Sequence, residues 1–295
     1  MGRMFFNLSV KERQLLSPGM VRVTFAGEEL SEFSSTGTGD EYLRLFFPNE
    51  ESGEVVLPII DDEGRWTYQE GKPPVRCATY TVRRFCPDER ELDIDFVVHE
   101  GGVAGTWAQA AAPGNPMTIN RPRGLYELPE DAEWQLLMAD ATGIPALARL
   151  LEETPPHITS RIVIEIAAPE HRQPLPDHPG ATVTWIEASG NGVAPSRLEA
   201  AFWAMNLPST PGYIWVAAEQ KPVRAIRKHV RQTLKLPAER YKLVAYWIEA
   251  KQEWDAGWNA LPSAVREEIE AAWQSGRDAE EVRDEVEAKL ETFNL

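Results

Sequence analysis

Tyr80 and Thr81 are neighbours in a strand-like run, where an aromatic ring and a hydroxyl can contact the same ligand. A tyrosine ring can stack on a flat heterocycle, and a threonine hydroxyl can hydrogen-bond a ring nitrogen. Further along the chain, the glycine-rich stretch 101–106 opens a predicted helix. The N–H groups and the dipole of a helix N-terminus favour a phosphate group. Each feature alone also fits an ordinary strand or turn, but together they indicate a site for a flat, anionic ligand.

Four arginines lie close to these residues in the sequence, although the chain as a whole is acidic. Its 295 residues carry a formal net charge of -16. Arg76, Arg83, Arg121 and Arg123 therefore stand out as candidate partners of an anionic ligand. The same acidity argues against a nucleic-acid partner, because a phosphate backbone is bound through clustered lysine and arginine.

The first half of the chain alternates short strand-like runs with turn residues. Residues 79–85 and 92–98 form one expected pair of strands, which leads into a helix expected over residues 103–112. Many short strands at this spacing predict a closed or nearly closed antiparallel barrel. Further strands are expected over residues 6–10, 21–25, 42–46 and 117–120.

The second half, after a linker at residues 129–133, alternates apolar strands with helices. This alternation predicts a parallel sheet covered on both faces, with ligands bound beyond the carboxyl ends of its strands. The expected strands are residues 134–139, 162–167, 183–186, 213–218 and 243–247.

The tail has a third pattern, rich in glutamate and alanine. A short bend flanked by Trp254 and Trp258 is expected before two helices over residues 262–274 and 278–292. The tail could cover a ligand bound near the last strand, or could simply pack on the outside of the second domain. We therefore divide the chain into a barrel at residues 1–128, an α/β domain at 129–252 and a helical extension at 253–295.

The two cysteines, Cys77 and Cys86, form no metal-ligand pattern, so we expect no protein-bound metal. Free thiols are typical of a reducing compartment. The N-terminus lacks the basic, apolar and small-residue segments of a secretory signal, and no apolar run approaches the ~18 residues of a membrane span. These features predict a cytoplasmic protein without stable membrane association.

Several ordered blocks of this sequence resemble the siderophore-interacting proteins, the FAD-containing ferric-siderophore reductases of the ferredoxin-reductase-like superfamily. The resemblance runs from the N-terminal strands to about Trp258 and leaves out the two helices of the tail. Its blocks are Tyr80-Thr81-Val82-Arg83, Asp95 to His99 with Gly105-Thr106-Trp107-Ala108, Pro113-Gly114, Leu136 to Ala146, Trp215 to Glu219, and Tyr246-Trp247.

The resemblance implies an N-terminal antiparallel Greek-key FAD-binding barrel followed by a parallel-sheet NAD(P)H-binding domain. It implies that Tyr80 lies on the isoalloxazine ring, that Thr81 bonds near its N5 atom, and that Glu219 lies near the reacting centre. These three residues are the catalytic candidates. The cofactor-binding candidates are Arg76, Tyr80, Thr81, Val82, Arg83, His99, Gly101, Gly102, Val103, Ala104, Gly105, Thr106, Trp107, Asp140, Thr142, Arg172 and Trp247.

The sequence departs from the family's pattern at three places. The family usually has an arginine two places before the stacking tyrosine, where this chain has Ala78. The pyrophosphate contact would then pass to Arg76, Arg83 or backbone amides. Residues 140–142 read Asp-Ala-Thr in place of the usual Asp-Glu-Thr, and residues 217–219 read Ala-Ala-Glu without the usual glycine.

By resemblance, NADPH or NADH reduces FAD, and FAD then reduces siderophore-bound Fe(III) to Fe(II) for iron release inside the cell. His171 and Arg172 could meet a 2'-phosphate, which favours NADPH. Ferric siderophores are often anionic, so Arg44, Lys242 and Lys251 are the expected contacts of the substrate.

Two other functions remain open at this point. A flavin reductase or electron-transfer flavoprotein of the same superfamily would keep FAD but use another acceptor. A non-enzymatic siderophore-binding adaptor would use the barrel as a scaffold, which Ala78 and the extra tail favour. We also expect the protein to be a monomer.

Overall fold

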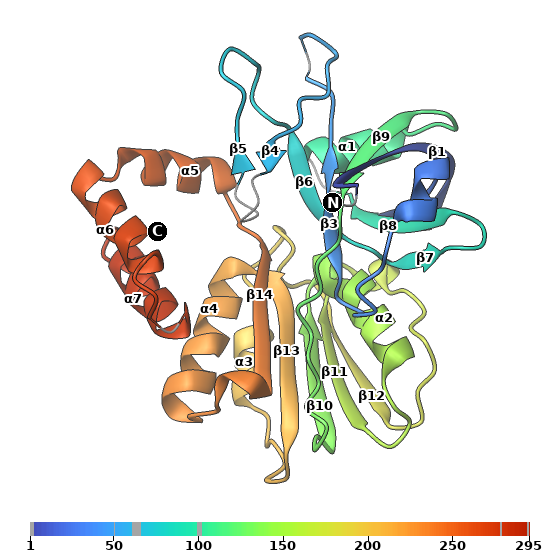
Figure 1. Ribbon diagram of the computed structural model, residues 1–295. Coiled ribbons are helices and arrows are strands. Elements are labelled where there is room, and N and C mark those ends of the chain that lie inside the picture. The colour runs from blue at the N-terminus through green and yellow to red at the C-terminus, as the bar shows by residue number, and fades with distance from the viewer. Residues whose placement is uncertain (1–2, 50, 61–65, 99–101, 278, 294) are drawn as a thin grey trace.

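The computed structural model describes residues 3–49, 51–60, 66–98, 102–277, 279–293 and 295. Seven antiparallel strands form the N-terminal sheet, in the order β6-β3-β9-β1-β2-β8-β7 (Figure 1). The sheet curls until the Tyr80 ring of β6 contacts the Phe96 ring of β8, and its apolar side chains fill one core. The strands are β1 (Phe5–Ser17), β2 (Met20–Ala26), β3 (Tyr42–Phe46), β6 (Cys77–Thr81), β7 (Arg84–Cys86), β8 (Glu91–Val97) and β9 (Pro116–Asn120).

Two smaller elements complete the first half. The helix α1 (Val103–Ala110) packs on the barrel through the buried Ala104 and Ala108. The strands β4 (Ile59–Ile60) and β5 (Trp66–Thr67) form a separate two-stranded sheet. The predicted antiparallel barrel is therefore confirmed.

The prediction of a single strand over residues 79–85 is wrong, because the chain changes its pairing partner in the middle of this segment. β6 pairs with β3, whereas β7 pairs with β8. At the break, the amide of Val82 donates to the carbonyl of Glu41 at 2.9 Å, and the amide of Arg83 donates to the carbonyl of Asp93 at 2.9 Å. The break places Tyr80 and Thr81 at the very end of a strand.

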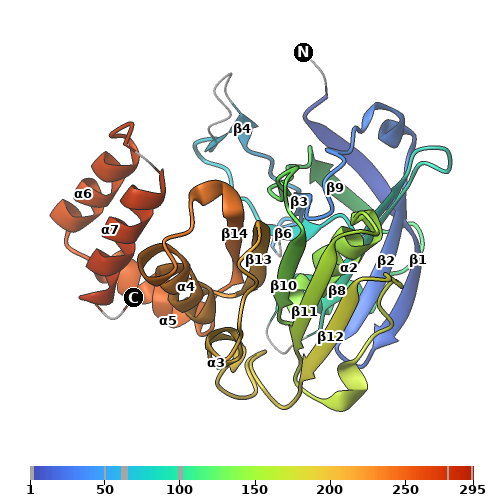
Figure 2. The ribbon, with the colours of Figure 1, turned by 90° about the horizontal axis from the view of Figure 1, so that it is seen from below.

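The predicted parallel sheet is confirmed, in the strand order β12-β11-β10-β13-β14. Figure 2 shows α2 (Ile144–Glu153) between this sheet and the barrel, with α3 (Leu198–Trp203) and α4 (Gln220–Lys228) on the opposite face. The core on the α2 side includes Met20 of β2, so the two halves share it. The strands are β10 (Trp134–Ala139), β11 (Thr159–Glu165), β12 (Ala181–Ile186), β13 (Gly212–Glu219) and β14 (Tyr241–Trp247).

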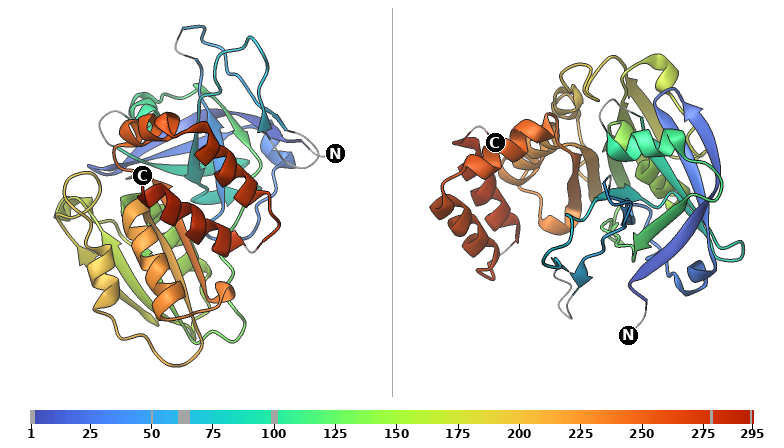
Figure 3. Two further views of the ribbon diagram at one scale, coloured as in Figure 1. Left: turned by 90° about the vertical axis from the view of Figure 1, so that its left-hand side faces the viewer. Right: turned by 90° about the horizontal axis from the view of Figure 1, so that it is seen from above.

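The tail forms three helices: α5 (Lys251–Ala260), α6 (Ser263–Trp273) and α7 (Ala279–Glu291). The last two confirm the predicted pair, but the expected short bend is wrong, because α5 occupies that segment. The indoles of Trp254 and Trp258 lie on successive turns of α5, 5.7 Å apart and stacked. The three helices enclose a small core of their own, and α7 lies beside α4 (Figure 3).

Within the described residues, no helix has the length and apolar character needed to cross a membrane. Cys77 and Cys86 are free thiols. The domain limits after residues 128 and 252 stay predictions.

Candidate active site

Tyr80 is half-buried at the end of β6, on a row of aromatic rings. Its ring centroid lies 4.6 Å from that of Phe96, which in turn lies 6.0 Å from that of Trp107. Burial raises the pKa of Tyr80 to about 12, so its phenol is protonated at neutral pH. Trp107 also contacts Phe25 and Phe47 in the barrel core.

Thr81 is buried, and its side chain lies near the hydroxyl of Tyr246 on β14. Burial raises the pKa of Tyr246, which keeps this phenol protonated. The end of β6 in the barrel therefore lies near the carboxyl end of β14 in the parallel sheet. The candidate site on the barrel and the candidate site at the carboxyl ends of the parallel strands therefore meet at one place.

The N-terminus of α1 offers backbone donors for an anion on the barrel. The first N–H groups of a helix have no partner within the helix. No acidic residue lies in the first turn, and the side chain of Val103 is 51% exposed, so an anion can approach. Ala104 and Gly105 are buried against the barrel, whereas Thr106 is exposed. Gly102 precedes the helix in an extended conformation, while His99 and Gly101 lie outside the described residues.

Asp140 lies at the carboxyl end of β10, is only 1% exposed, and accepts four hydrogen bonds. Its Oδ1 accepts from the amide and the hydroxyl of Thr142 at 2.8 and 2.6 Å. Its Oδ2 accepts from the amide of Glu219 at 2.9 Å and from Nε1 of Trp247 at 2.6 Å. Burial raises the pKa of Asp140, against the opposing effect of these bonds. This carboxylate thereby gathers the ends of β10, β13 and β14.

Glu219 ends β13, and its carboxylate accepts from the amides of Lys221 at 2.6 Å and Glu249 at 3.1 Å. It therefore caps α4 and holds the segment that follows β14. Gly143 lies against the same strand, since a Cβ atom there would be 2.5 Å from the carbonyl oxygen of Ala217. Only a glycine lets the start of α2 approach β13 this closely.

The predicted arginine and valine contacts have partners within the protein. The guanidinium of Arg76 donates to the carbonyl of Pro48 at 2.9 Å. Arg83 forms a two-pronged bond with Glu152 of α2, at 3.0 and 2.6 Å. Val82 is buried, and its backbone holds the end of β6 against α2. Ala78 lies on the same face of β6 as Tyr80 and also contacts the barrel core.

Arg172 lies beyond the carboxyl end of β11, at the outer side of the parallel sheet. It pairs with Glu187 at 2.5 Å, and its guanidinium lies 5.8 Å from the centre of the Trp185 ring. The neighbouring His171 lies so close to the β1–β2 turn that a Cβ atom on Gly19 would be 2.6 Å from its Nδ1. Arg172 is half exposed and remains open to solvent on one side.

The three candidate substrate contacts lie at separate places. Arg44 is 4.3 Å from the centre of the Trp66 ring, in a cavity of about 220 Å³ that Arg121 and Arg123 also line. Lys242 lines a different cleft of about 560 Å³ between β14, α4 and α7. Lys251 lies on α5 and pairs with Asp255 at 2.7 Å.

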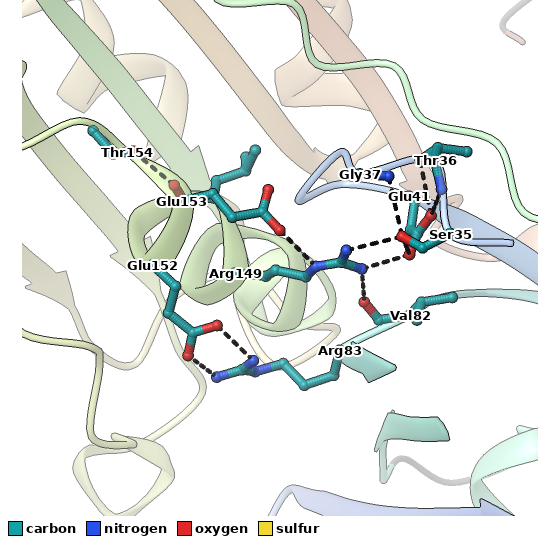
Figure 4. A network of polar contacts seen from close by, with 11 residues as sticks. Ser35, Thr36, Gly37, Glu41, Val82, Arg83, Arg149, Glu152, Glu153 and Thr154 are labelled. Carbon is teal, nitrogen blue, oxygen red and sulfur yellow. Dashed lines mark hydrogen bonds and ion pairs between the residues drawn. The ribbon is translucent and has the colours of Figure 1, made fainter. Parts of the chain in front are cut away.

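Sequence reasoning missed the residues that join the two halves. The Oδ1 of Asp40 accepts from the amides of Leu125 and Tyr126 at 2.9 Å, and its Oδ2 accepts from Nε1 of Trp215 at 3.1 Å. The adjacent Glu41 pairs with Arg149 of α2 at 2.7 Å (Figure 4). Asp40 and Glu41 end a loop rich in threonine and glycine, and this pattern is typical of an ordinary turn.

No group of three or more His, Cys, Asp or Glu side chains is arranged to hold a metal ion in the part of the chain that the structure describes. The arrangement instead offers a stacking ring, a hydroxyl, an open helix N-terminus and the gathered ends of a parallel sheet. Such parts suit two nucleotides that meet at the boundary between the sheets.

Comparisons with known proteins agree with this geometry. Residues 9–126 match the model of the siderophore-interacting FAD-binding domain, and residues 132–250 match that of the siderophore-interacting protein. The chain is 30% identical to the ferric vibriobactin reductase ViuB of Vibrio cholerae serotype O1, over 83% of this chain and 90% of the relative. It is 31% identical to the NADPH-dependent ferric-chelate reductase of Escherichia coli, over 82% and 92%.

A solved structure shows the same similarity in three dimensions. The siderophore utilization protein from T. fusca is 31% identical, with a TM-score of 0.74 over 85% of this chain and 96% of that one. The two family models end at residue 250, before α5, α6 and α7. Two family models that together cover most of the sequence, and relatives of this identity and coverage, make the chain a member of the siderophore-interacting protein family.

Proposed function

We propose that this protein is an FAD-dependent ferric-siderophore reductase, which uses NAD(P)H to reduce siderophore-bound Fe(III) to Fe(II) for iron release. The observation that carries the proposal is a contact at the end of β6, where the carbonyl of Val82 accepts from Nη1 of Arg149 of α2 at 2.9 Å. It brings the strand of the stacking Tyr80 to the sheet edge where Asp140 gathers three strand ends. Bound FAD supplies the redox chemistry, since it takes a hydride from NAD(P)H and passes single electrons to iron.

The residues present fit FAD. The half-buried ring of Tyr80 can lie against a flat ring system, and its protonated phenol adds no charge there. The open N-terminus of α1 supplies N–H donors for a pyrophosphate. Because Ala78 replaces the family's usual arginine, backbone amides are expected to bind the pyrophosphate in its place. The N–H donors of α1 support this expectation. Since Arg76 and Arg83 bond Pro48 and Glu152, we propose that they shape this site rather than provide its main phosphate contacts.

The nicotinamide nucleotide would bind at the carboxyl ends of the parallel strands. Asp140 holds Thr142, Glu219 and Trp247 in place, so these residues form a rigid floor for the nicotinamide. Arg172 lies at the far side of the same edge, where it could meet a 2'-phosphate once its pair with Glu187 opens. This position favours NADPH, and the relative from Escherichia coli is an NADPH-dependent ferric-chelate reductase.

The ferric siderophore would bind in the cavity of Arg44. Three arginines and the Trp66 ring meet there, in a protein with an acidic total charge. Cationic side chains attract an anionic chelate, and the indole can lie against a catecholate or another flat chelating group. Lys242 and Lys251 lie elsewhere, so we propose them only as contacts along the approach.

Steady-state turnover distinguishes this function from its two alternatives. Purified protein with FAD and NADPH or NADH is offered ferric catecholates, ferric hydroxamates and free flavin, and a coloured Fe(II) chelator reports reduction. A ferric-siderophore reductase reduces the chelates, whereas a general flavin reductase reduces only free flavin. A siderophore-binding adaptor would bind the chelate but show no flavin absorbance and no FAD binding on titration.

We further propose a cytoplasmic monomer with the three parts 1–128, 129–252 and 253–295. The two free thiols support the reducing compartment. Light scattering of the eluting protein measures the mass, and limited proteolysis tests the limits at 128 and 252.

A further inference from the structure

Arg149 and Glu41 form a buried ion pair between the two halves of the candidate active site. On α2, the Nη1 of Arg149 donates to Oε1 of Glu41 at 2.7 Å and to the carbonyl of Val82 at 2.9 Å (Figure 4). The Nε of Arg149 donates to Glu153 at 2.9 Å. Glu41 is 0% exposed and Arg149 9%, so solvent screens this pair little.

On the barrel side, the pair fixes the end of the strand that carries Tyr80 and Thr81. Val82 follows Thr81 directly, and both of its backbone polar groups end in this network. Its amide donates to the carbonyl of Glu41 at 2.9 Å, and its carbonyl accepts from Arg149. The Glu41 carboxylate is itself held by Ser35 at 2.8 Å. The stacking strand therefore cannot shift without moving the pair.

On the other side, the pair fixes the start of α2. This helix begins at Ile144, directly after the turn in which Asp140 holds Thr142. Arg149 lies five residues into the helix, about 7.5 Å along its axis. Since a helix of this length moves as a rigid rod, a displacement at Arg149 also displaces Thr142.

The loop that carries Glu41 is pressed directly onto α2. A Cβ atom on Gly39 would lie 2.8 Å from the amide nitrogen of Leu150, so the backbones meet at a glycine. The next residue, Asp40, bonds Trp215 of β13. Residues 39–41 thus contact the second half at three consecutive positions, and Arg149 is the long side chain that reaches back into the barrel.

We propose that Arg149 is a positioning residue for hydride transfer. Through Glu41 and Val82, it sets the separation between the flavin-stacking end of β6 and the nicotinamide end of α2. Hydride transfer needs the reacting atoms about 3 to 3.5 Å apart, and a displacement of about 1 Å can cost about 10²-fold in rate. The inference rests on the proposed function, because it assumes that the two cofactors meet at this boundary.

The test separates positioning from stability. Arg149→Met removes the guanidinium but leaves Glu41 as an unpaired buried charge, which destabilises the fold. The double variant Glu41→Gln with Arg149→Met removes both charges and recovers part of this stability, although the Val82 carbonyl still lacks its donor. Arg240→Met is the matched control, since it removes a two-pronged pair with Asp131 on the outside of the second half.

Anaerobic rapid mixing with NADPH measures the rate of flavin bleaching, and fluorescence titration measures FAD affinity. Amide hydrogen exchange over residues 79–83 of the FAD-free protein reports the freedom of the strand end. We expect the double variant to bleach at least tenfold more slowly than wild type. Its FAD dissociation constant should stay within threefold, its exchange over residues 79–83 should be faster, and its urea midpoint should be above that of Arg149→Met.

Two results would overturn the inference. A double variant that regains the wild-type bleaching rate together with its stability would make the pair purely structural. If Arg240→Met slowed flavin bleaching as much as the double variant does, the loss of any ion pair would have this effect. Failure of the proposed function looks different, because wild-type protein would then not be bleached by NADPH at all.

Discussion

Nε1 of Trp247 donates a hydrogen bond of 2.6 Å to Oδ2 of Asp140, and this bond ties the end of β14 to the end of β10. The same oxygen accepts the amide of Glu219 from β13, which lies between them. A single buried carboxylate therefore sets the shape of the edge where the nicotinamide would lie. Asp140 accepts four hydrogen bonds, and a conservative substitution can disturb them.

Asp140→Asn should damage both stability and flavin reduction by NADPH. An amide has one acceptor oxygen, so its NH2 group must face the donors of Thr142 or those of Trp247 and Glu219. Leaving buried donors unsatisfied costs about 1 to 3 kcal/mol. Urea unfolding should show this loss, and bleaching by NADPH should slow about tenfold. Trp247→Phe removes one donor only, so it should cost less. Wild-type behaviour of Asp140→Asn in both assays would contradict this role.

The Tyr80 ring, rather than its hydroxyl, should hold the flavin. Tyr80→Phe keeps the ring on Phe96 and should leave the FAD dissociation constant within about threefold. Tyr80→Ala removes a stacking contact of about 0.5 to 1.5 kcal/mol beyond its buried area, and should weaken FAD about tenfold or more. Fluorescence titration of the FAD-free variants measures both constants. Equal affinities for the two variants would remove Tyr80 from the flavin site.

Alkaline pH should remove the stabilising effect of the Tyr80 phenol. Its pKa is raised by burial from 10.0 to about 12 in the folded protein. Its contribution to stability is therefore complete below pH 10 and is lost as the pH rises towards 12. Urea unfolding of wild type and Tyr80→Phe at pH 8, 10 and 11 measures the difference. The free energy of unfolding of wild type should fall relative to the variant, and a constant difference would contradict the burial of this phenol.

Much of the fold could be predicted because strong local patterns carry it. The apolar run 134–139 coincides with β10, since a strand buried on both faces shows little but apolar residues. The two helices of the tail follow from their glutamate- and alanine-rich pattern. By contrast, α5 mixes Gly257 with polar residues and two tryptophans, so its helical character does not show in a simple pattern.

The boundary between the halves could not be predicted, because its contacts join residues far apart in the sequence. Glu41 and Arg149 are 108 positions apart, and each alone looks like a surface charge. The split between β6 and β7 has the same origin, since Val82 turns towards Glu41 rather than continuing its strand. Candidate residues such as Tyr80 and Asp140 could be identified from the sequence because they lie in contiguous motifs.

The cavity of Arg44 should determine affinity for an anionic ferric siderophore. Arg44→Met removes one of three arginines there, and should raise the KM for an anionic ferric catecholate about fivefold or more with little change in kcat. The loss should shrink at high ionic strength, because salt screens exposed charges. Arg90→Met, which breaks an exposed pair with Glu28 on the barrel, is the control. An unchanged KM for Arg44→Met would place the siderophore elsewhere.

The most direct measurement of the central claim is a sequential anaerobic mixing experiment. Protein loaded with FAD is first bleached by one equivalent of NADPH and then mixed with excess ferric siderophore, while an Fe(II) chelator reports product. We expect the flavin absorbance to return as about two Fe(II) form per FAD, because a hydride carries two electrons and each iron accepts one. Flavin that stays bleached until air is admitted, with no Fe(II) formed, would contradict ferric-siderophore reduction by this protein.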